Sequence, residues 1–161
     1  MVGRHLEQAG LRILAADDSN HGATTLVRRW RSVGAHILSM KRLTGLEAVQ
    51  KAYEVQPDVI LLDISIPKLD GIAAERQIRS KCPKSKMLFV SEDRSLDVVR
   101  EALSTGVQGY VVKSDGAELL AAVDAVCQGR FFVNKSLAKN SLVAADLDRA
   151  RDKFRDLTRA H

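Results

Sequence analysis

Residues 57–71, with the sequence PDVILLDISIPKLDG, contain the stretch that decides the fold. The apolar run from Val59 to Leu62 is too short for a typical helix and has no 3.6-residue period. Such runs are typical of buried strands in parallel sheets. Asp63 follows at the predicted carboxyl end of this strand. Because ligands bind outside the carboxyl ends of strands in open α/β sheets, Asp63 is the first candidate for a reactive group.

Length and composition fit one domain with an appendage. The chain has 161 residues, of which 45% are hydrophobic and 28% charged, which is typical of a soluble globular protein. We find no pattern of a signal peptide or membrane span, so we expect a cytoplasmic protein without membrane contact. The two cysteines, Cys82 and Cys127, form no C-x-x-C pair and predict free thiols. The net charge of +5 is weak evidence for a nucleic-acid partner.

Short apolar runs alternate with amphipathic helical patterns over most of the chain. Each predicted strand is followed by a helix, the first over about residues 20–33 and the last over about residues 115–128; the predicted strands cover residues 11–16, 35–39, 58–63, 86–91 and 107–113. Thr44 and Glu47 have the spacing of a capping box at the start of the second helix. The alternation predicts an α/β fold with a doubly wound, five-stranded parallel sheet covered on both faces.

The pattern changes after Gly129. A short apolar patch at residues 131–133 precedes Asn134, which is predicted to cap one long helix to the chain end. That helix carries a heptad stripe, made of Val143, Leu147, Ala150, Phe154 and Leu157. The stripe is compatible with a self-associating or docking helix and with a plain amphipathic linker. We therefore expect a flexible lead-in over residues 1–10, a domain over 11–129 and a linker or dimerisation helix over 130–161.

Three carboxylates follow predicted strands: Asp17 and Asp18 after the first, and Asp63 after the third. They should converge at one sheet edge, and crowded carboxylates need protonation or a compensating cation. An all-oxygen site suits a hard divalent ion such as Mg²⁺. Ser91 and Lys113 end two further strands on the same edge. A hydroxyl and an ammonium beside an acidic site indicate a place for a transferred phosphoryl group.

These five positions carry a resemblance to a known family. Residues 11–128 resemble the CheY-like receiver domain of two-component response regulators in the type, order and spacing of these residues. Asp63 to Gly71 also has the pattern Asp-x-x-x-Pro-x-x-Asp-Gly. The resemblance implies a (βα)5 flavodoxin-like fold with an extra C-terminal helix. It also implies a phosphoacceptor signalling domain rather than an enzyme acting on a separate substrate.

The resemblance implies a role for each site residue. Asp63 accepts a phosphoryl group from a sensor histidine kinase or phosphotransfer protein. Asp18, Asp63 and the backbone carbonyl of Ser65 bind Mg²⁺ (or Mn²⁺) directly, and Asp17 helps through water.

The remaining implied roles concern phosphoryl binding and switching. Lys113 pairs with the phosphoryl oxygens and Ser91 hydrogen-bonds to them. Tyr110, three residues before Lys113, resembles the aromatic switch of the family, which turns inward as Ser91 moves toward the phosphate. Glu92 departs from the small residue usual at its position, and this predicts slower uptake from small phosphodonors.

Each site residue also has an ordinary explanation on its own. An Asp-Asp pair after a strand is usually a turn or a helix cap, Ser91 can simply end a strand, and Lys113 can be solvated. Only the joint pattern of residues favours the phosphoacceptor function.

Residues 106–115 most resemble receivers of the NarL/LuxR class, whose linker leads into a helix-turn-helix. No helix-turn-helix pattern occurs in this sequence, so we expect DNA contact only through an output domain not present in this chain. In the full-length protein we expect transcription regulation and homodimerisation. One alternative is a pseudo-receiver that acts by phosphorylation-independent protein interaction. A phosphohydrolase is disfavoured, because Ser65 stands where an Asp-x-Asp general acid would be.

Overall fold

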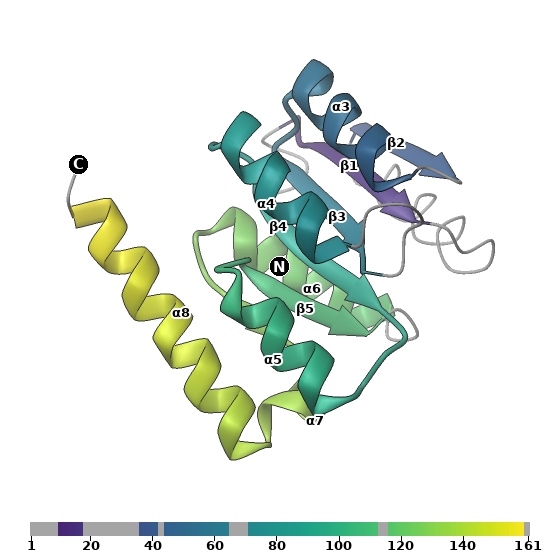
Figure 1. Ribbon diagram of the computed structural model, residues 1–161. Coiled ribbons are helices and arrows are strands. Elements are labelled where there is room, and N and C mark those ends of the chain that lie inside the picture. Colours follow the sequence, from purple (N-terminus) through teal and green to yellow (C-terminus); the bar gives the residue numbers. More distant parts are fainter. Residues whose placement is uncertain (1–9, 18–35, 42–43, 65–70, 113–115, 160–161) are drawn as a thin grey trace.

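The computed structural model describes residues 10–17, 36–41, 44–64, 71–112 and 116–159. The predicted helix at about residues 20–33 lies outside these ranges. Strands and helices alternate along the chain (Figure 1), in the order β1 (Arg12–Asp17), β2 (His36–Lys41), α3 (Gly45–Val55), β3 (Val59–Asp63), α4 (Gly71–Lys81), β4 (Lys86–Ser91), α5 (Leu96–Ser104), β5 (Gly109–Val112), α6 (Gly116–Cys127), β6 (Phe132–Val133), α7 (Lys135–Ala138) and α8 (Ser141–Arg159).

The strands form one parallel sheet with the order β2-β1-β3-β4-β5-β6. The predicted parallel α/β architecture is confirmed, and the sheet has one strand more than predicted. The apolar patch at residues 131–133 supplies this strand, which pairs with β5 through Gly109 opposite Phe132 and Tyr110 opposite Val133. A Cβ atom at Gly109 would clash with the Phe132 carbonyl, so glycine permits the close approach of β6.

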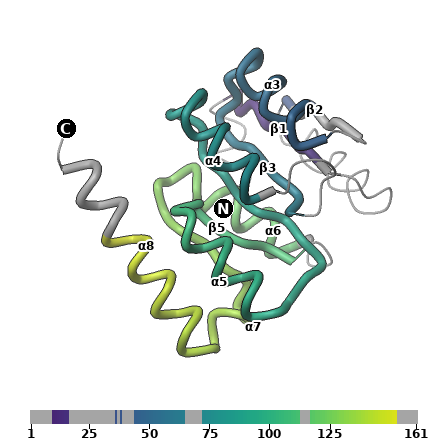
Figure 2. The backbone as a smooth tube through the Cα atoms, viewed as in Figure 1, coloured from purple at the N-terminus to yellow at the C-terminus, as the bar shows by residue number. Residues whose placement is uncertain are grey.

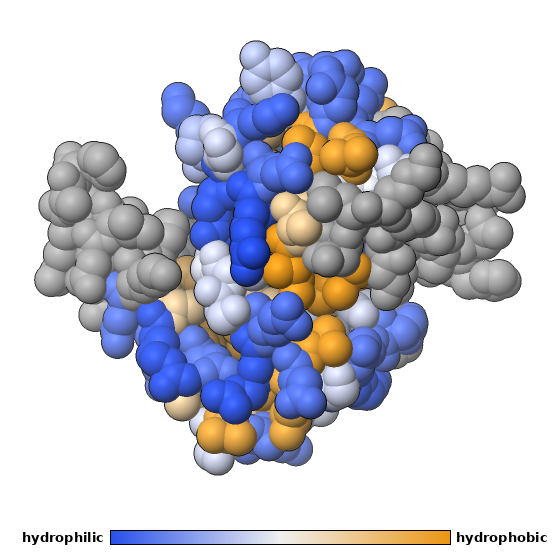
Figure 3. Space-filling model, viewed as in Figure 1, coloured by the Kyte–Doolittle hydropathy of each residue, from blue (hydrophilic) through white to orange (hydrophobic). Residues whose placement is uncertain are grey.

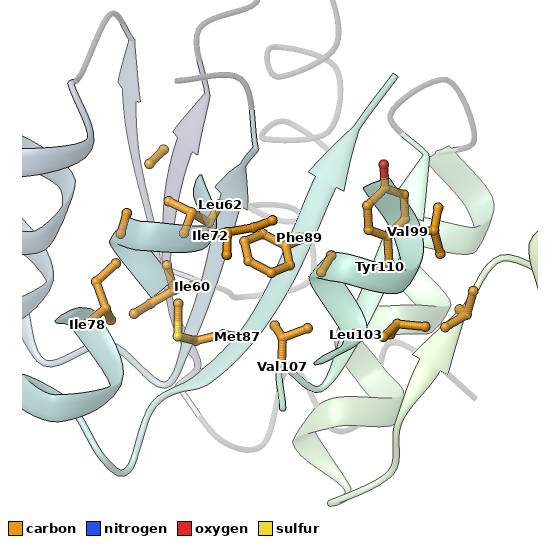
Figure 4. Close-up of a cluster of buried hydrophobic side chains, with 14 of the residues drawn as sticks. Ile60, Leu62, Ile72, Ile78, Met87, Phe89, Val99, Leu103, Val107 and Tyr110 are labelled. Atoms are coloured by element: carbon orange, nitrogen blue, oxygen red, sulfur yellow. The ribbon is translucent and has the colours of Figure 1, made fainter. Parts of the chain in front are cut away.

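Helices cover both faces of the sheet. In the ribbon and tube views α3, α4 and α5 lie on one face and α6 on the other (Figures 1 and 2). The interior residues of the central strands are apolar because alternate side chains enter two separate cores. Figure 4 shows the α4/α5 side, where Ile60 and Leu62 of β3 and Phe89 of β4 belong to one core with side chains of both helices. The intervening Leu61 and Leu88 belong to the core on the α6 side.

The surface is mostly hydrophilic on the face that carries α4 and α5. Apolar side chains reach that surface between these two helices (Figure 3). In the described part of the chain, no helix combines the length and apolar character needed to cross a membrane.

The capping box that begins α3 is confirmed. The Glu47 backbone N donates to Thr44 Oγ1 at 3.1 Å, and the Thr44 N donates to Glu47 Oε1 at 3.3 Å. Both bonds satisfy backbone N–H groups that have no partner within the helix.

The prediction of one long C-terminal helix capped by Asn134 is wrong. The helix is divided into α7 and α8, and the Asn134 side chain makes no capping bond to α7. Asn140 caps α8 instead, because its Oδ1 accepts from the backbone N of Leu142 at 2.9 Å and of Val143 at 3.3 Å. The Asn134 amide is bonded to another part of the fold, described below.

The first half of the heptad stripe packs within the same chain. Val143, Leu147 and Ala150 are buried in the core that contains α5. Arg100 of α5 donates to Asp146 of α8 with an Nε–Oδ2 distance of 2.8 Å. Beyond this contact α8 extends away from the sheet (Figure 1). The side chains of Phe154 and Leu157 lie outside the described part of the structure.

Candidate functional site

Three predicted site positions end neighbouring strands. Ala16 of β1 pairs with Leu62 of β3, so the chain positions of Asp17 and Asp63 are adjacent at the carboxyl edge. Ser91 ends β4, the next strand of the sheet, one residue beyond the partner of Asp63. The parallel sheet therefore brings these positions together, as the sequence predicts.

Four predicted site groups lie outside the described residues. These are the side chain of Asp17 and all of Asp18, Ser65 and Lys113. Their predicted roles are therefore still predictions.

Asp63 is buried, with only 4% of its surface exposed. A buried carboxylate needs polar or ionic partners in the fold, and Asp63 has interactions of this kind. The adjacent strand-end positions 17 and 63 carry oxygen donors of the type that Mg²⁺ prefers. Among the described side chains no three metal-binding groups cluster, so a metal site here needs residues outside the described ranges. The donor chemistry fits the magnesium ion predicted from the sequence.

Two polar turns connect Ser91 to the start of α5. The Asp93 N donates to Ser91 Oγ at 3.0 Å, and the Ser95 N donates to Asp93 Oδ1 at 2.8 Å. Hydrogen bonds from the backbone and side chain of Ser95 lower the pKa of the Asp93 carboxyl. Since α5 begins at Leu96, one short hydrogen-bonded segment connects Ser91 to α5.

Tyr110 has no exposed surface and contacts this same segment. Its hydroxyl donates to the Asp93 carbonyl at 2.5 Å. Figure 4 shows the ring near Val99. Burial raises the pKa of the Tyr110 phenol, so it remains a neutral donor at neutral pH. Tyr110 and Ser91 thus both bond to Asp93, from two adjacent strands.

The bridging role of Asp93 was not predicted from the sequence, in which Glu92 was the only acid of this segment singled out. Glu92 is exposed on this loop, whereas Asp93 links β4, β5 and α5. The Ser91-x-Asp93-x-Ser95 spacing is a signal for consecutive side-chain turns, but the contact of Asp93 with Tyr110 has no local signal.

The known family explains this arrangement of strand-end residues. Residues 5–124 match the family model of the response regulator receiver domain. The chain belongs to this family. The receiver domain is a signalling domain of two-component systems.

One relative of this chain is a transcriptional activator. The transcriptional activator protein ExaE of Pseudomonas putida is 33% identical over 96 residues, which cover 59% of this chain and 45% of that protein. The chain thus matches less than half the length of this relative.

Solved structures support both the fold and the class of the receiver. A LuxR-family two-component response regulator from Aurantimonas sp. SI85-9A1 has a TM-score of 0.70 and 26% identity, covering 88% of this chain and 97% of that chain. A chain of the CheX-CheY-BeF3-Mg complex from Borrelia burgdorferi has a TM-score of 0.65 and 28% identity. The match covers 72% of this chain and 88% of that chain. The predicted resemblance to CheY-like and NarL/LuxR receivers is confirmed.

Residues that follow the receiver match contact the end of β5. The Val112 N donates to Asn134 Oδ1 at 2.6 Å, and Asn134 Nδ2 donates to Glu118 Oε2. Glu118 Oε1 also accepts from the Lys135 N at 3.1 Å. The sequence does not predict this network, because asparagine before a helix usually caps that helix.

An ion pair within α4, between buried Glu75 and exposed Arg79, is bonded to the carboxyl end of α5. Glu75 has no exposed surface and pairs with Arg79, whose NH1 donates to the Thr105 carbonyl at 2.5 Å. Burial raises the pKa of the Glu75 carboxyl, and the charge of Arg79 opposes this effect. No pattern in the sequence predicted this connection.

Proposed function

We propose that this receiver accepts a phosphoryl group on Asp63 from a phosphohistidine of a sensor histidine kinase or phosphotransfer protein. The observation that carries the proposal is the buried Asp63 at the carboxyl end of β3, one strand away from Ser91. Ser91 in turn bonds to the segment that contacts Tyr110 and begins α5. A modification at Asp63 therefore has a short physical route to a helix of the fold.

The proposed transfer is a displacement at phosphorus. An Asp63 carboxylate oxygen attacks the phosphorus, the P–N bond to the donor imidazole breaks, and an acyl phosphate forms. A carboxylate and a phosphoryl group repel each other, so positive charge must offset both. We assign the phosphoryl oxygens to the ammonium of Lys113 and the hydroxyl of Ser91.

A divalent cation fits the same edge. We assign Mg²⁺, or Mn²⁺, to Asp17, Asp18, Asp63 and the backbone carbonyl of Ser65. When bound, the cation offsets negative charge on the acceptor and the phosphoryl group.

Phosphorylation would bias the segment between β4 and α5. Ser91 Oγ accepts from the Asp93 N, and a new bond from the Ser91 hydroxyl to a phosphoryl oxygen would reorient it. Asp93 also bonds to Tyr110, so we propose these residues as the switch. A local charge that favours one of two loop arrangements shifts the population of the whole domain.

We propose that the regulatory effect on transcription is carried by a part of the protein outside residues 11–129. Residues 130–161 are proposed as the linker toward an output domain that contacts DNA, in a cytoplasmic transcription regulator. The similarity to ExaE and to a LuxR-family response regulator supports this assignment.

A phosphorylation-independent interaction protein is the second candidate. The stripe residues Val143 and Leu147 already pack on α5, so α8 has a defined position without any requirement on Asp63. In this case homodimerisation through the carboxyl end of α8 would carry the function.

Acetyl phosphate with Mg²⁺ tests the proposal. Intact-mass spectrometry should show one added phosphoryl group on the parent and none on Asp63→Asn. Equal labelling of both proteins would refute Asp63 as acceptor. No labelling of the parent, by acetyl phosphate or by a phosphorylated histidine donor, would favour the second candidate. Multiple turnover of a phosphoester would instead indicate a phosphohydrolase.

A further inference from the structure

We infer that Asn134 is a positioning residue for the phosphoryl-transfer site, because it fixes the backbone next to Lys113. The inference rests on the proposed function and extends it to the C-terminal segment. Asn134 lies outside residues 5–124, which match the receiver family model. It follows the short strand β6 and precedes α7.

The first contact anchors the end of β5. Asn134 is buried, with 2% of its surface exposed, and its Oδ1 accepts from the Val112 N at 2.6 Å. The pairing of β5 with β6 ends at Tyr110 and Val133, so the Asn134 side chain supplies the next acceptor along this edge. A buried backbone N–H needs such a partner. Lys113 is joined to Val112 by one peptide bond.

The second contact anchors the start of α6. Asn134 Nδ2 donates to Glu118 Oε2, and Glu118 lies in the first turn of this helix. Glu118 Oε1 also accepts from the Lys135 N at 3.1 Å. One buried amide therefore ties together the last residue of β5 and the first turn of α6, on either side of residues 113–115.

An ordinary helix-capping role does not account for Asn134. Its side chain makes no bond to the backbone of α7, whereas Asn140 makes two such bonds at the start of α8. The two asparagines belong to the same C-terminal segment but have different partners. Asn140 is therefore a matched control for the loss of an asparagine from this segment.

The position of the anchor predicts a selective defect. In the sheet, β4 separates β5 from β3 and β1, which carry the proposed Mg²⁺ ligands. Loss of Asn134 should disturb the proposed Lys113 contact with the phosphoryl group and leave Mg²⁺ binding intact. A small misplacement of a charged group that contacts the reacting atoms can lower a rate by about tenfold or more.

The test compares Asn134→Ala with Asn140→Ala in the full chain. Phosphoryl uptake is measured from acetyl phosphate by intact mass, beryllofluoride binding by fluorine NMR, and binding of Mg²⁺ alone by calorimetry. For Asn134→Ala we expect about tenfold slower uptake and weaker beryllofluoride binding. Its Mg²⁺ affinity should remain within about twofold of the parent, because the ligands are distant. Asn140→Ala should match the parent in all three.

An exchange of side chains tests the network itself. Asn134→Asp keeps the acceptor for the Val112 N but places a second carboxylate against Glu118. The double variant Asn134→Asp/Glu118→Gln restores a donor and an acceptor between the two side chains with unchanged net charge. We expect slow uptake in Asn134→Asp and recovery to within about threefold of the parent in the double variant.

Three outcomes would overturn the inference. They are parental uptake by Asn134→Ala, an equal loss of Mg²⁺ and beryllofluoride binding in that variant, and no recovery in the exchanged pair. The second outcome indicates a structural role only. Failure of the proposed function has a different signature, since the parent itself then acquires no phosphoryl group, and the inference fails with it.

Discussion

Tyr110 of β5 donates its hydroxyl hydrogen to the backbone carbonyl of Asp93 at 2.5 Å. This bond joins an interior strand to the segment between β4 and α5. Asp93 also donates to Ser91 through its backbone N, so the segment is held from two strands. The proposed switch consequently consists of one bonded unit rather than a serine and a tyrosine acting separately.

Removing the Tyr110 hydroxyl should weaken this unit without opening the core. In Tyr110→Phe the ring is retained and one buried hydrogen bond is lost, so we expect the free energy of unfolding to fall by about 0.5–1.5 kcal/mol. Urea denaturation measures the change. Tyr110→Ala is the comparison, since loss of the whole ring should cost about 3–5 kcal/mol. Unchanged stability in Tyr110→Phe would argue against the bond with Asp93.

Two leucines of α8 should differ strongly in their effect on stability. Leu147 is 7% exposed in the core shared with α5, whereas Leu142 is 49% exposed. Leu147→Ala should lower the free energy of unfolding by about 2–5 kcal/mol through a cavity. Leu142→Ala should change it by about 0.5 kcal/mol or less. Equal small effects in urea denaturation would contradict the packing of α8 on α5.

The buried Glu75 should make stability depend on pH. Its folded-state pKa is raised by burial, against the charges of Arg79 and Arg76, so its contribution is fully present below the unfolded pKa. That contribution is lost as pH rises through the folded pKa. Relative to Glu75→Gln, the parent should therefore lose stability as pH rises above 4.5, the ordinary pKa of a glutamate carboxyl. The exposed Glu101→Gln is the control, and parallel curves for parent and Glu75→Gln would exclude the effect.

The exposed Glu92 should slow phosphorylation by small anionic donors. Its negative charge lies one residue from Ser91 at the carboxyl edge of the sheet. Glu92→Ala should raise the rate of labelling by acetyl phosphate by about two- to tenfold at low salt, and less at high salt. Glu101→Ala, an exposed acid of α5, is the charge-matched control. Equal rates for Glu92→Ala and the parent would remove the electrostatic argument.

The sequence by itself determined the α/β class, the carboxyl-edge positions of Asp63 and Ser91, and the capping box of α3, because these depend on local periodicity and short spacings. The edge strand β6 has only two residues, which is too short for such patterns to detect.

Only the tertiary structure decided the bonding partners of Asn134 and Tyr110 and the face on which the heptad stripe packs. Asn134 has the local signature of a helix cap, yet its amide bonds to Val112, 22 residues away in sequence. Tyr110 bonds to Asp93, 17 residues away. Each bond pairs a polar group of a buried residue, the Val112 N–H in one case and the Tyr110 hydroxyl in the other, and leaving such a group unpaired costs free energy.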